Sequence, residues 1–290
     1  MTQRSFIVGS EWLYYKIYSG PKATDLILTE IVLPCIQGFE ERKLIEKWFF
    51  IRYADPKHHL RLRFLVSDKK HITTIVDELF EHLEPLLAKD VVWKVQLDTY
   101  HRELERYGDN TMELSESLFC ADSRATVQFL DLIEGDEGEQ LRWLFGLRAT
   151  EVLLSCFQYS LDEKLSLMEQ LKIGFGREFN MSRPLKKQLD DKYRKERDGI
   201  EQFMQFTAEA KPDYIPILEI LNETQKMISL IAEEILALTQ QDALQMSKNN
   251  LMGSYIHMLM NRLFKSKNRL NEMVCYDFLY RYYRTKKARG

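Results

Sequence analysis

The 290-residue sequence lacks most features that mark secreted, membrane and metal-binding proteins. Its four cysteines lie far apart with no CxxC pair, which favours buried thiols in a reducing cytosol over disulfides or a zinc site. No apolar run approaches the roughly 20 residues that span a bilayer. Residues 1–10 also lack the apolar core and cleavage site of a signal peptide. The sequence therefore predicts a cytoplasmic protein without a membrane span.

Charge, histidine spacing and glycine content exclude further classes. The formal net charge of −3 argues against a general nucleic-acid binder, which is usually basic over a whole face. The six histidines include no HExxH motif, and a β-strand would point the adjacent His58 and His59 to opposite faces. The glycines at 174 and 176 make too short a motif for a phosphate-binding loop. We therefore expect no metal, no organic cofactor and no direct contact with nucleic acid.

The first part of the chain alternates β-prone and amphipathic segments. A composition of 45% hydrophobic and 29% charged residues is typical of a globular protein with a substantial core. The order of segments is β-α-β-β-α-β, which is the ferredoxin-like pattern, and it predicts a four-stranded antiparallel sheet with two helices on one face. The expected strands are 12–19, 45–54, 58–66 and 91–100, and the expected helices are 22–37 and 70–88.

The rest of the chain has helical periodicity almost throughout. The predicted fold class is therefore α+β, with the N-terminal ferredoxin-like sheet packed against a largely α-helical C-terminal half. We place the change at residue 110, so that 1–110 is the sheet region and 111–290 the helical region. Because no long Pro/Gly/Ser linker separates them, we expect one compact unit. The expected helices are 114–135, 138–172, 183–209, 213–240, 243–265 and 268–285.

The most informative block is FFIRYADPKHHLRLRF at residues 49–64, which reads as two strands joined by a turn at Asp55-Pro56. Side chains alternate across a strand, so His59, Arg61 and Arg63 share one face of the second strand. Guanidinium groups bind carboxylates and phosphates bidentately, so this face is a candidate anion site. The alternative is a solvated cationic face, and the pattern alone leaves both open.

Two later clusters carry ionisable side chains at helical spacing. Glu103 and Arg106 are three residues apart and would meet on one side of a helical turn, either as a surface ion pair or as part of a site. His257 and Asn261 are one helical turn apart, so Asn261 could orient the imidazole. A lone histidine on a helix is more often structural than catalytic.

Four blocks, taken in order, resemble one known family. They are WLYYKIYSG at 12–20, WFFIRYADPKHHLRLRF at 48–64, YHRELERYG at 100–108 and HMLMNRL at 257–263. The sequence resembles the C-terminal elimination domain of lantibiotic dehydratases, also known as the thiopeptide-type bacteriocin biosynthesis domain, over nearly the whole chain. Full dehydratases of this family carry a much larger N-terminal glutamylation domain. The resemblance therefore implies a stand-alone elimination subunit, with residues 1–290 forming one elimination domain.

This resemblance implies a lyase that acts on a ribosomally made precursor peptide. A separate tRNA-dependent subunit would esterify Ser or Thr side chains with glutamate, and this protein would expel the glutamate to leave dehydroalanine or dehydrobutyrine. The functional positions implied are Arg61, Arg63, Glu103, Arg106 and His257. In this hypothesis Arg63 and Arg106 hold the glutamyl group, Arg61 supports them, and Glu103 orients an arginine. His257 is either the base at Cα or the acid that protonates the departing carboxylate.

The remaining assignments and alternatives stay open at this stage. His59 is expected to pack beside the arginines, and Asn261 to orient His257. One alternative function within the same family is that of a pyridine synthase, which closes a thiopeptide ring by a formal [4+2] cycloaddition. Another is a non-catalytic subunit that binds the peptide for its partner. The sequence does not fix the oligomeric state, and a homodimer is one of the possibilities.

Overall fold

The computed structural model describes residues 2–290, apart from the side chain of Asp136. The chain divides into two compact units, Met1–Leu132 with Ala237–Ser247, and Ile133–Leu236 with Lys248–Gly290. The predicted boundary at residue 110 falls inside the first unit, because the following helix packs with the sheet. That the whole chain acts as one elimination domain stays a prediction. Within residues 2–290, no helix combines the length and apolar character needed to cross a bilayer.

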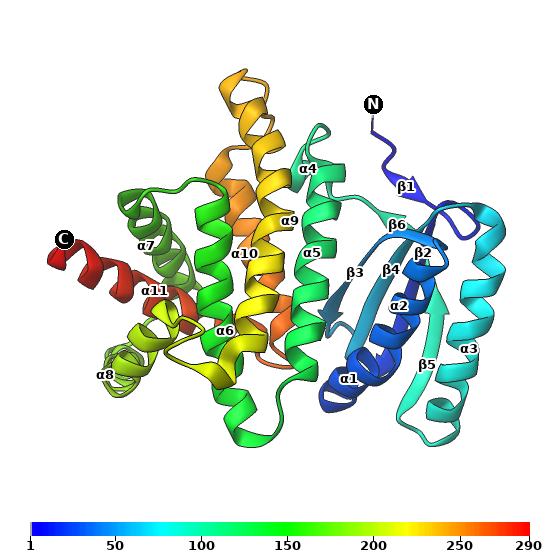
Figure 1. The fold of residues 1–290 in the computed structure, drawn as a ribbon, viewed down its shortest axis with the longest axis horizontal. Helices are drawn as coiled ribbons and strands as arrows, with labels where there is room; N and C mark the ends of the chain where they lie inside the picture. Colours follow the sequence, from blue (N-terminus) through cyan, green and yellow to red (C-terminus); the bar gives the residue numbers. More distant parts are fainter. Residues whose placement is uncertain (1) are drawn as a thin grey trace. The chain divides into compact units, whose positions relative to one another are not determined.

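The first unit contains the predicted antiparallel sheet (Figure 1). Its strand order is β3-β4-β2-β5, so the first strand of the βαββαβ sequence pairs with the third and the fourth. This is the order of a ferredoxin-like sheet, and the predicted fold class is confirmed. The strands are β2 (Trp12–Ser19), β3 (Ile45–Tyr53), β4 (His59–Val66) and β5 (Val92–Leu97).

One face of the sheet is apolar and packs on the helices. Leu60, Leu62 and Phe64 alternate along β4 and have no exposed surface. The Phe64 ring meets the ring of Phe39 edge to face at 6.0 Å between centroids. Because successive side chains of a strand point to opposite faces, the cationic residues of β4 occupy the other side. The helical segments here are α1 (Pro21–Ile27), the π-helix η1 (Leu28–Val32), α2 (Leu33–Glu41), the 3₁₀-helix η2 (Lys69–His71) and α3 (Ile72–Ala88).

Two predicted boundaries in this unit are wrong. The helical segment expected to end at residue 37 continues to Glu41, and Pro34 is tolerated because it lies in the first turn of α2, where its missing N–H matters little. The strand expected over 91–100 ends at Leu97. Tyr100 lies instead in the short strand β6 (Tyr100–His101), which pairs with β1 (Ser5–Phe6) in a separate two-stranded sheet.

Helix α5 (Met112–Asp131) packs along β3, which is an edge strand of the sheet. The backbone N–H of Phe50 on β3 donates to the Ser123 hydroxyl at 3.2 Å. The rings of Phe49 and Phe119 lie 5.4 Å apart. A helix that accepts a hydrogen bond from the backbone of an edge strand in this way protects the strand from pairing with another chain. The short helix α4 (Leu104–Tyr107) precedes α5.

The second unit is helical, as predicted, but the helix expected over 138–172 is two helices. The first ends at Cys156, and the second begins after Ser160, whose hydroxyl accepts from the Glu163 N–H in a capping box. The rings of Trp143 and Tyr193 both pack edge to face on Phe278 in the core. The elements are α6 (Gly135–Cys156), α7 (Leu161–Glu178), α8 (Arg183–Gln205), η3 (Pro212–Tyr214), α9 (Ile215–Gln240), α10 (Lys248–Leu263) and α11 (Asn268–Arg289), with the end of α9 in the first unit.

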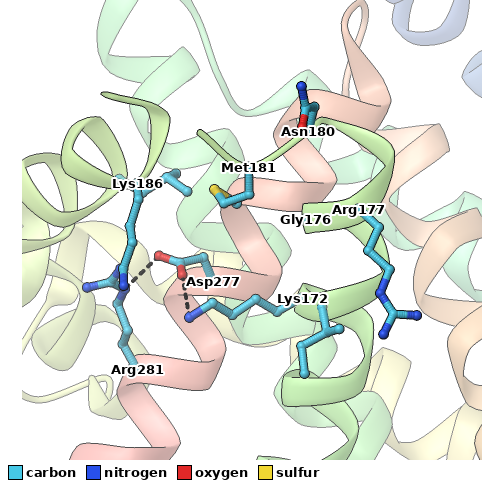
Figure 2. Close-up of a pocket in the computed structure, with 10 residues that line it drawn as sticks. Lys172, Gly176, Arg177, Asn180, Met181, Lys186, Asp277 and Arg281 are labelled. Carbon is cyan, nitrogen blue, oxygen red and sulfur yellow. Dashed lines mark hydrogen bonds and ion pairs between the residues drawn. The ribbon is translucent and has the colours of Figure 1, made fainter. Parts of the chain in front are cut away.

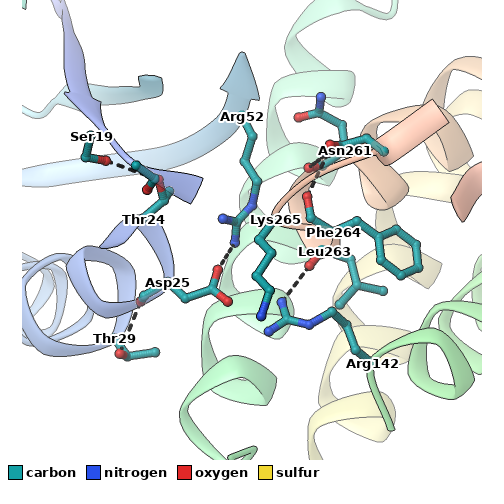
Figure 3. Close-up of polar contacts among 12 residues, drawn as sticks. Ser19, Thr24, Asp25, Thr29, Arg52, Arg142, Asn261, Leu263, Phe264 and Lys265 are labelled. Atoms are coloured by element: carbon teal, nitrogen blue, oxygen red, sulfur yellow. Dashed lines mark hydrogen bonds and ion pairs between the residues drawn. The ribbon is translucent and has the colours of Figure 1, made fainter. Parts of the chain in front are cut away.

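Buried arginines stabilise each unit separately (Figure 3). In the first, Arg52 of β3 is 3% exposed and forms an ion pair with Asp25 of α1 at 2.6 Å. In the second, Arg142 of α6 donates to the backbone carbonyl of Leu263 at 2.8 Å and thereby satisfies the C-terminal end of α10.

Candidate active site

The strand register places aromatic side chains on both sides of Arg63. Tyr14 of β2 and Phe49 of β3 lie directly opposite Arg63 in the two neighbouring strands. The guanidinium carbon is 4.3 Å from the centroid of Tyr14 and 5.2 Å from that of Phe49. Tyr100 of β6 supplies a third ring at 4.9 Å. We call these three rings, Tyr14, Phe49 and Tyr100, the aromatic cage.

The cage buries the Arg63 guanidinium without giving it a counter-ion. The residue is 7% exposed, and its Nε has no hydrogen-bond partner. No carboxylate among residues 2–290 forms an ion pair with it. Burial lowers the pKa of Arg63, yet an arginine keeps its charge at neutral pH. A desolvated cation that packs against ring faces and lacks an ion-pair partner is stabilised by an anion that enters, and this makes the site a candidate anion-binding site.

Arg61 and His59 lie on the same face and contact each other. The Nε–H of Arg61 donates to Nε2 of His59 at 3.1 Å, and the guanidinium stacks 3.5 Å from the centroid of Tyr53. The Nδ1–H of His59 donates to the carbonyl of Lys57 at 2.8 Å. Burial is the main cause that lowers the pKa of His59. His59 is therefore neutral at pH 7, with both nitrogens engaged, so it can orient Arg61 but not readily exchange a proton.

Lys16 is a cation on this face that the sequence patterns did not single out. It lies directly opposite Arg61 in the β2–β4 pairing and forms an ion pair with Asp98. The hydrogen bond from Lys16 holds the pKa of Asp98 below its usual range. The carboxylate therefore partly neutralises the positive charge beside Arg61.

Glu103 and Arg106 form the ion pair that their spacing predicts, with 3.2 Å between carboxylate and guanidinium. Glu103 is the N-cap residue of α4 and Arg106 lies in that helix. Their side chains are 60% and 45% exposed, so the pair alone contributes little to stability. The negative charge of Glu103 partly offsets the lowering of the pKa of Arg63. Both residues lie in the first unit, and Glu103 is near enough to Arg63 to act on its charge.

The structure adds a second arginine of the YHRELERYG block that sequence reasoning missed. Arg102 is buried and donates to both carboxylate oxygens of Glu116 at 2.7 Å. The hydroxyl of Tyr100 donates to the same carboxylate at 2.8 Å. Burial raises the pKa of Tyr100 well above its ordinary value, so this hydroxyl stays protonated. The bidentate pair therefore fixes the ring of Tyr100 over Arg63.

His257 of α10 belongs to the second unit and is oriented by Glu272 of α11. Its Nδ1 lies 3.1 and 3.0 Å from the two carboxylate oxygens. A carboxylate can only accept, so Nδ1 carries a proton, and in the neutral imidazole Nε2 then has the free lone pair. The histidine side chain is 30% exposed, whereas that of Glu272 is 1% exposed. Such a carboxylate–imidazole pair suits a general base.

That Asn261 orients His257 stays a prediction. Nδ1 of His257 is occupied by Glu272, and the backbone carbonyl of Asn261 accepts from the Asn268 side chain at 2.8 Å. The hydroxyl of Tyr276 donates to Glu272 at 2.7 Å and holds the carboxylate in place. The predicted residues thus fall in two sets, five on the first unit and His257 with Asn261 on the second. No cluster of three or more metal-ligating side chains occurs within the described part of the chain.

Comparison with known families agrees with the motifs. A family model described as lantibiotic biosynthesis dehydratase C-terminal domain matches residues 12–283. The chain belongs to this family. Nisin biosynthesis protein NisB of Lactococcus lactis subsp. lactis is 32% identical over 158 residues, which cover 54% of this chain and 15% of NisB. Subtilin biosynthesis protein SpaB of Bacillus subtilis is 29% identical over 180 residues, covering 60% of this chain and 17% of SpaB. The chain thus spans less than a fifth of either relative.

Solved structures share the fold. The tRNA-dependent lantibiotic dehydratase MibB from Microbispora sp. 107891 has a TM-score of 0.75 at 20% identity, over 98% of this chain and 29% of MibB. The pyridine synthase TbtD from thiomuracin biosynthesis has a TM-score of 0.64 at 14% identity, over 95% of this chain and all of TbtD. Because these two proteins are named for different reactions, the fold alone does not select one of them.

Proposed function

We propose that this chain eliminates glutamate from glutamylated Ser and Thr side chains of a ribosomally made peptide, leaving dehydroalanine or dehydrobutyrine. The observation that carries the proposal is Arg63, a buried guanidinium that the aromatic cage surrounds and with which no carboxylate of the described residues forms an ion pair. Elimination needs such a site, because the leaving group is an anion. A cycloaddition between two dehydroalanines releases no glutamate and does not require one.

The reaction needs a base and cationic groups that bind the departing glutamate. The base removes the Cα proton, the electron pair forms the Cα=Cβ double bond, and the Cβ–O bond of the ester breaks. Glutamate leaves with two carboxylates, one present throughout and one formed as the bond breaks. Cations that meet the developing carboxylate stabilise the transition state by on the order of 3 kcal/mol each.

Each residue has a role in this proposal. Arg63 and Arg106 hold the glutamyl group and its developing carboxylate, and Arg61 supports them. Glu103 orients Arg106, its ion-pair partner. His257 takes the Cα proton at Nε2 or protonates the departing carboxylate. His59 fixes Arg61 through the bond between their side chains.

The partners follow from the reaction. The substrate is a precursor peptide that a separate tRNA-dependent glutamylating protein has esterified, and both proteins act in the cytoplasm. The names of the relatives, biosynthesis proteins of nisin and subtilin, support a peptide substrate of the lantibiotic type. The proposed reaction makes the chain a lyase that uses no cofactor.

The test is mass spectrometry of a Ser/Thr-glutamylated precursor peptide incubated with the purified protein alone. Loss of one glutamic acid per modified site, giving alkenes that add a thiol, is the expected result. Intact esters on a peptide that binds would favour the peptide-binding subunit instead. Ring closure of an already dehydrated peptide would favour the pyridine synthase.

Two variants tie the reaction to the site. His257→Ala should accumulate glutamylated peptide, and Arg63→Lys should lower kcat by roughly 100-fold, the usual effect of losing one transition-state contact. The matched control is Arg42→Lys, because Arg42 also lies near a ring, that of Phe39, but on the helical side of the sheet. Full activity of His257→Ala would remove this residue from the mechanism.

A further inference from the structure

A concave site in the second unit contains none of the predicted site residues. It has a volume of about 620 Å³ and lies between α7, the start of α8 and α11 (Figure 2). We call it the α7–α11 pocket. Its lining includes four cationic side chains, one carboxylate and apolar side chains such as Ile173, which is 49% exposed. The charged lining residues are Lys172, Arg177, Lys186, Asp277 and Arg281.

A buried carboxylate fixes two of the cations. Asp277 is 1% exposed, and its oxygens lie 2.9 Å from Nζ of Lys172 and 2.6 Å from Nε of Arg281. Arg281 also forms an ion pair with Asp190 of α8 at 2.6 Å. These contacts hold α7, α8 and α11 together and leave the remaining guanidinium N–H groups of Arg281 at the pocket wall.

The other two cations have no ion-pair partner within residues 2–290. Arg177 and Lys186 lie on either side of the Asp277 ion pairs, one on α7 and the other on α8 (Figure 2). Both side chains are exposed. The pocket lining is therefore net positive although the whole chain carries a formal charge of −3. A local excess of positive charge on an acidic protein attracts anions to that place.

We propose that the α7–α11 pocket binds an acidic peptide segment, with carboxylates on Arg177 and Lys186 and an apolar side chain against Ile173. The proposal rests on the proposed function only in that the substrate is a peptide, and it adds a recognition site apart from the arginine face of the first unit. A peptide fits better than a nucleic acid, because the lining contains no aromatic side chain on which a base could stack.

The binding test uses a fluorescein-labelled peptide of alternating glutamate and leucine, followed by anisotropy with the whole protein. Lys186→Glu and Arg177→Glu should each weaken binding by about tenfold, because each replaces an attraction with a repulsion. The matched control is Lys187→Glu, which makes the same charge change on the next residue of α8, outside the pocket lining. It should leave the affinity unchanged.

Three results would overturn the proposal. The first is that the acidic peptide does not bind, and the second is that Lys187→Glu weakens binding as much as the two pocket variants do. The third is that a labelled oligothymidylate binds more tightly than the peptide and loses this binding in Lys186→Glu and Arg177→Glu. Failure of the elimination reaction is separable, because the probe carries no glutamyl ester. Arg63→Lys should reduce elimination and leave this binding unchanged.

A second inference concerns Glu272, which we infer to be the positioning residue of His257. The carboxylate is buried, accepts from Nδ1 of His257 and is itself held by Tyr276. It therefore selects the tautomer in which Nε2 is free to exchange a proton. The inference deepens the proposed function, since Nε2 is the atom assigned to the Cα proton or the leaving carboxylate.

The tautomer can be measured without substrate. In ¹⁵N-labelled protein, the ring shifts of the neutral imidazole of His257, followed over a pH series, should report a proton on Nδ1. Glu272→Gln keeps an oxygen acceptor and should keep this tautomer, whereas Glu272→Leu should move the proton toward Nε2. An unchanged tautomer in Glu272→Leu would overturn the inference whatever the reaction is. Tyr280→Phe, which also removes a hydroxyl from α11 but one that donates to Glu169, is the folding control.

Discussion

At the residue scale, the aromatic cage and Arg63 depend on one another. A cation over an aromatic face is stabilised by about 1–2 kcal/mol when desolvated, so removing one ring loosens the guanidinium. Tyr14→Leu should therefore lower kcat/KM for elimination by roughly tenfold. Tyr14→Phe keeps the ring and should retain most of the activity. Equal losses in the two variants would mean that the hydroxyl, and not the ring face, is what Arg63 requires.

His59 predicts a pH dependence of stability. Burial lowers its pKa in the folded protein, so the unfolded chain binds a proton first as pH falls through its ordinary value of about 6.5. The stabilisation is complete above that pH and is lost progressively as pH falls toward the folded pKa. Urea midpoints measured between pH 7.5 and 5 should decline, and His59→Gln should flatten this decline. The matched substitution His82→Gln, at an exposed position of α3, should leave the decline as it was.

The face shared by His59, Arg61 and Arg63 could be predicted from the sequence, but the aromatic cage around Arg63 could not. Alternation along β4 predicts that His59, Arg61 and Arg63 share a face, because the period of a strand is two residues. Burial of Arg63 arises from rings on β2, β3 and β6, which only the pairing of distant strands brings together. Likewise, helical spacing could not predict that Glu272 contacts His257, because Glu272 lies 15 residues further on and in another helix.

At the element scale, the capping box at the start of α7 separates it from α6. Ser160 accepts from the Glu163 N–H, and the Glu163 carboxylate accepts from the Ser160 N–H at 2.7 Å. Ser160→Ala should lower the free energy of unfolding by about 1 kcal/mol, since it leaves an amide at the helix start without its partner. Ser166→Ala, an exposed change inside α7, should have little effect or stabilise slightly. Denaturation in urea measures both, and equal losses would contradict the cap.

The S-x-x-E signature of this cap is present in the sequence, but the prediction of one helix over 138–172 rested on apolar periodicity alone. The ferredoxin-like order was predictable because its strands alternate with helices of clear apolar stripes, such as Ile75, Leu79 and Leu83 of α3. The strand β6 was not predictable, since a strand of two residues is too short to show an alternation of apolar and polar side chains. Its pairing with β1 links segments that are nearly a hundred positions apart.

At the scale of the whole molecule, neither unit is a continuous stretch of chain. The first unit includes Ala237–Ser247, which the chain reaches only after most of the second unit has been synthesised. Sequence composition cannot reveal this, because the segment is short and its hydrophobic content is close to that of the whole chain. The consequence is that cutting at residue 110 or 132 would remove part of the first unit, so both units are best studied in the full chain.

Gln245 shows how that returning segment completes the first unit. Its side-chain oxygen accepts from the Asp109 N–H at 2.6 Å, and the Asn110 side chain donates to the carbonyl of Ala243 at 2.7 Å. These bonds hold the turn that follows α4, the helix of Arg106. Gln245→Leu should therefore lower the free energy of unfolding by about 1 kcal/mol. It should also speed amide exchange at Asp109, whose N–H loses its acceptor.

Gln241→Leu is the control for this change, because Gln241 is exposed in the same segment and its side chain makes neither bond. In Gln241→Leu, the amide of Asp109 should exchange at the same rate as in the parent protein. Gln245→Leu could also slow elimination. In that case the segment Ala237–Ser247 also positions α4, the helix of Arg106, because the Gln245 side chain holds the turn that follows this helix. Unchanged exchange at Asp109 would show that the first unit forms without this bond, and the segment would then serve only as a connection.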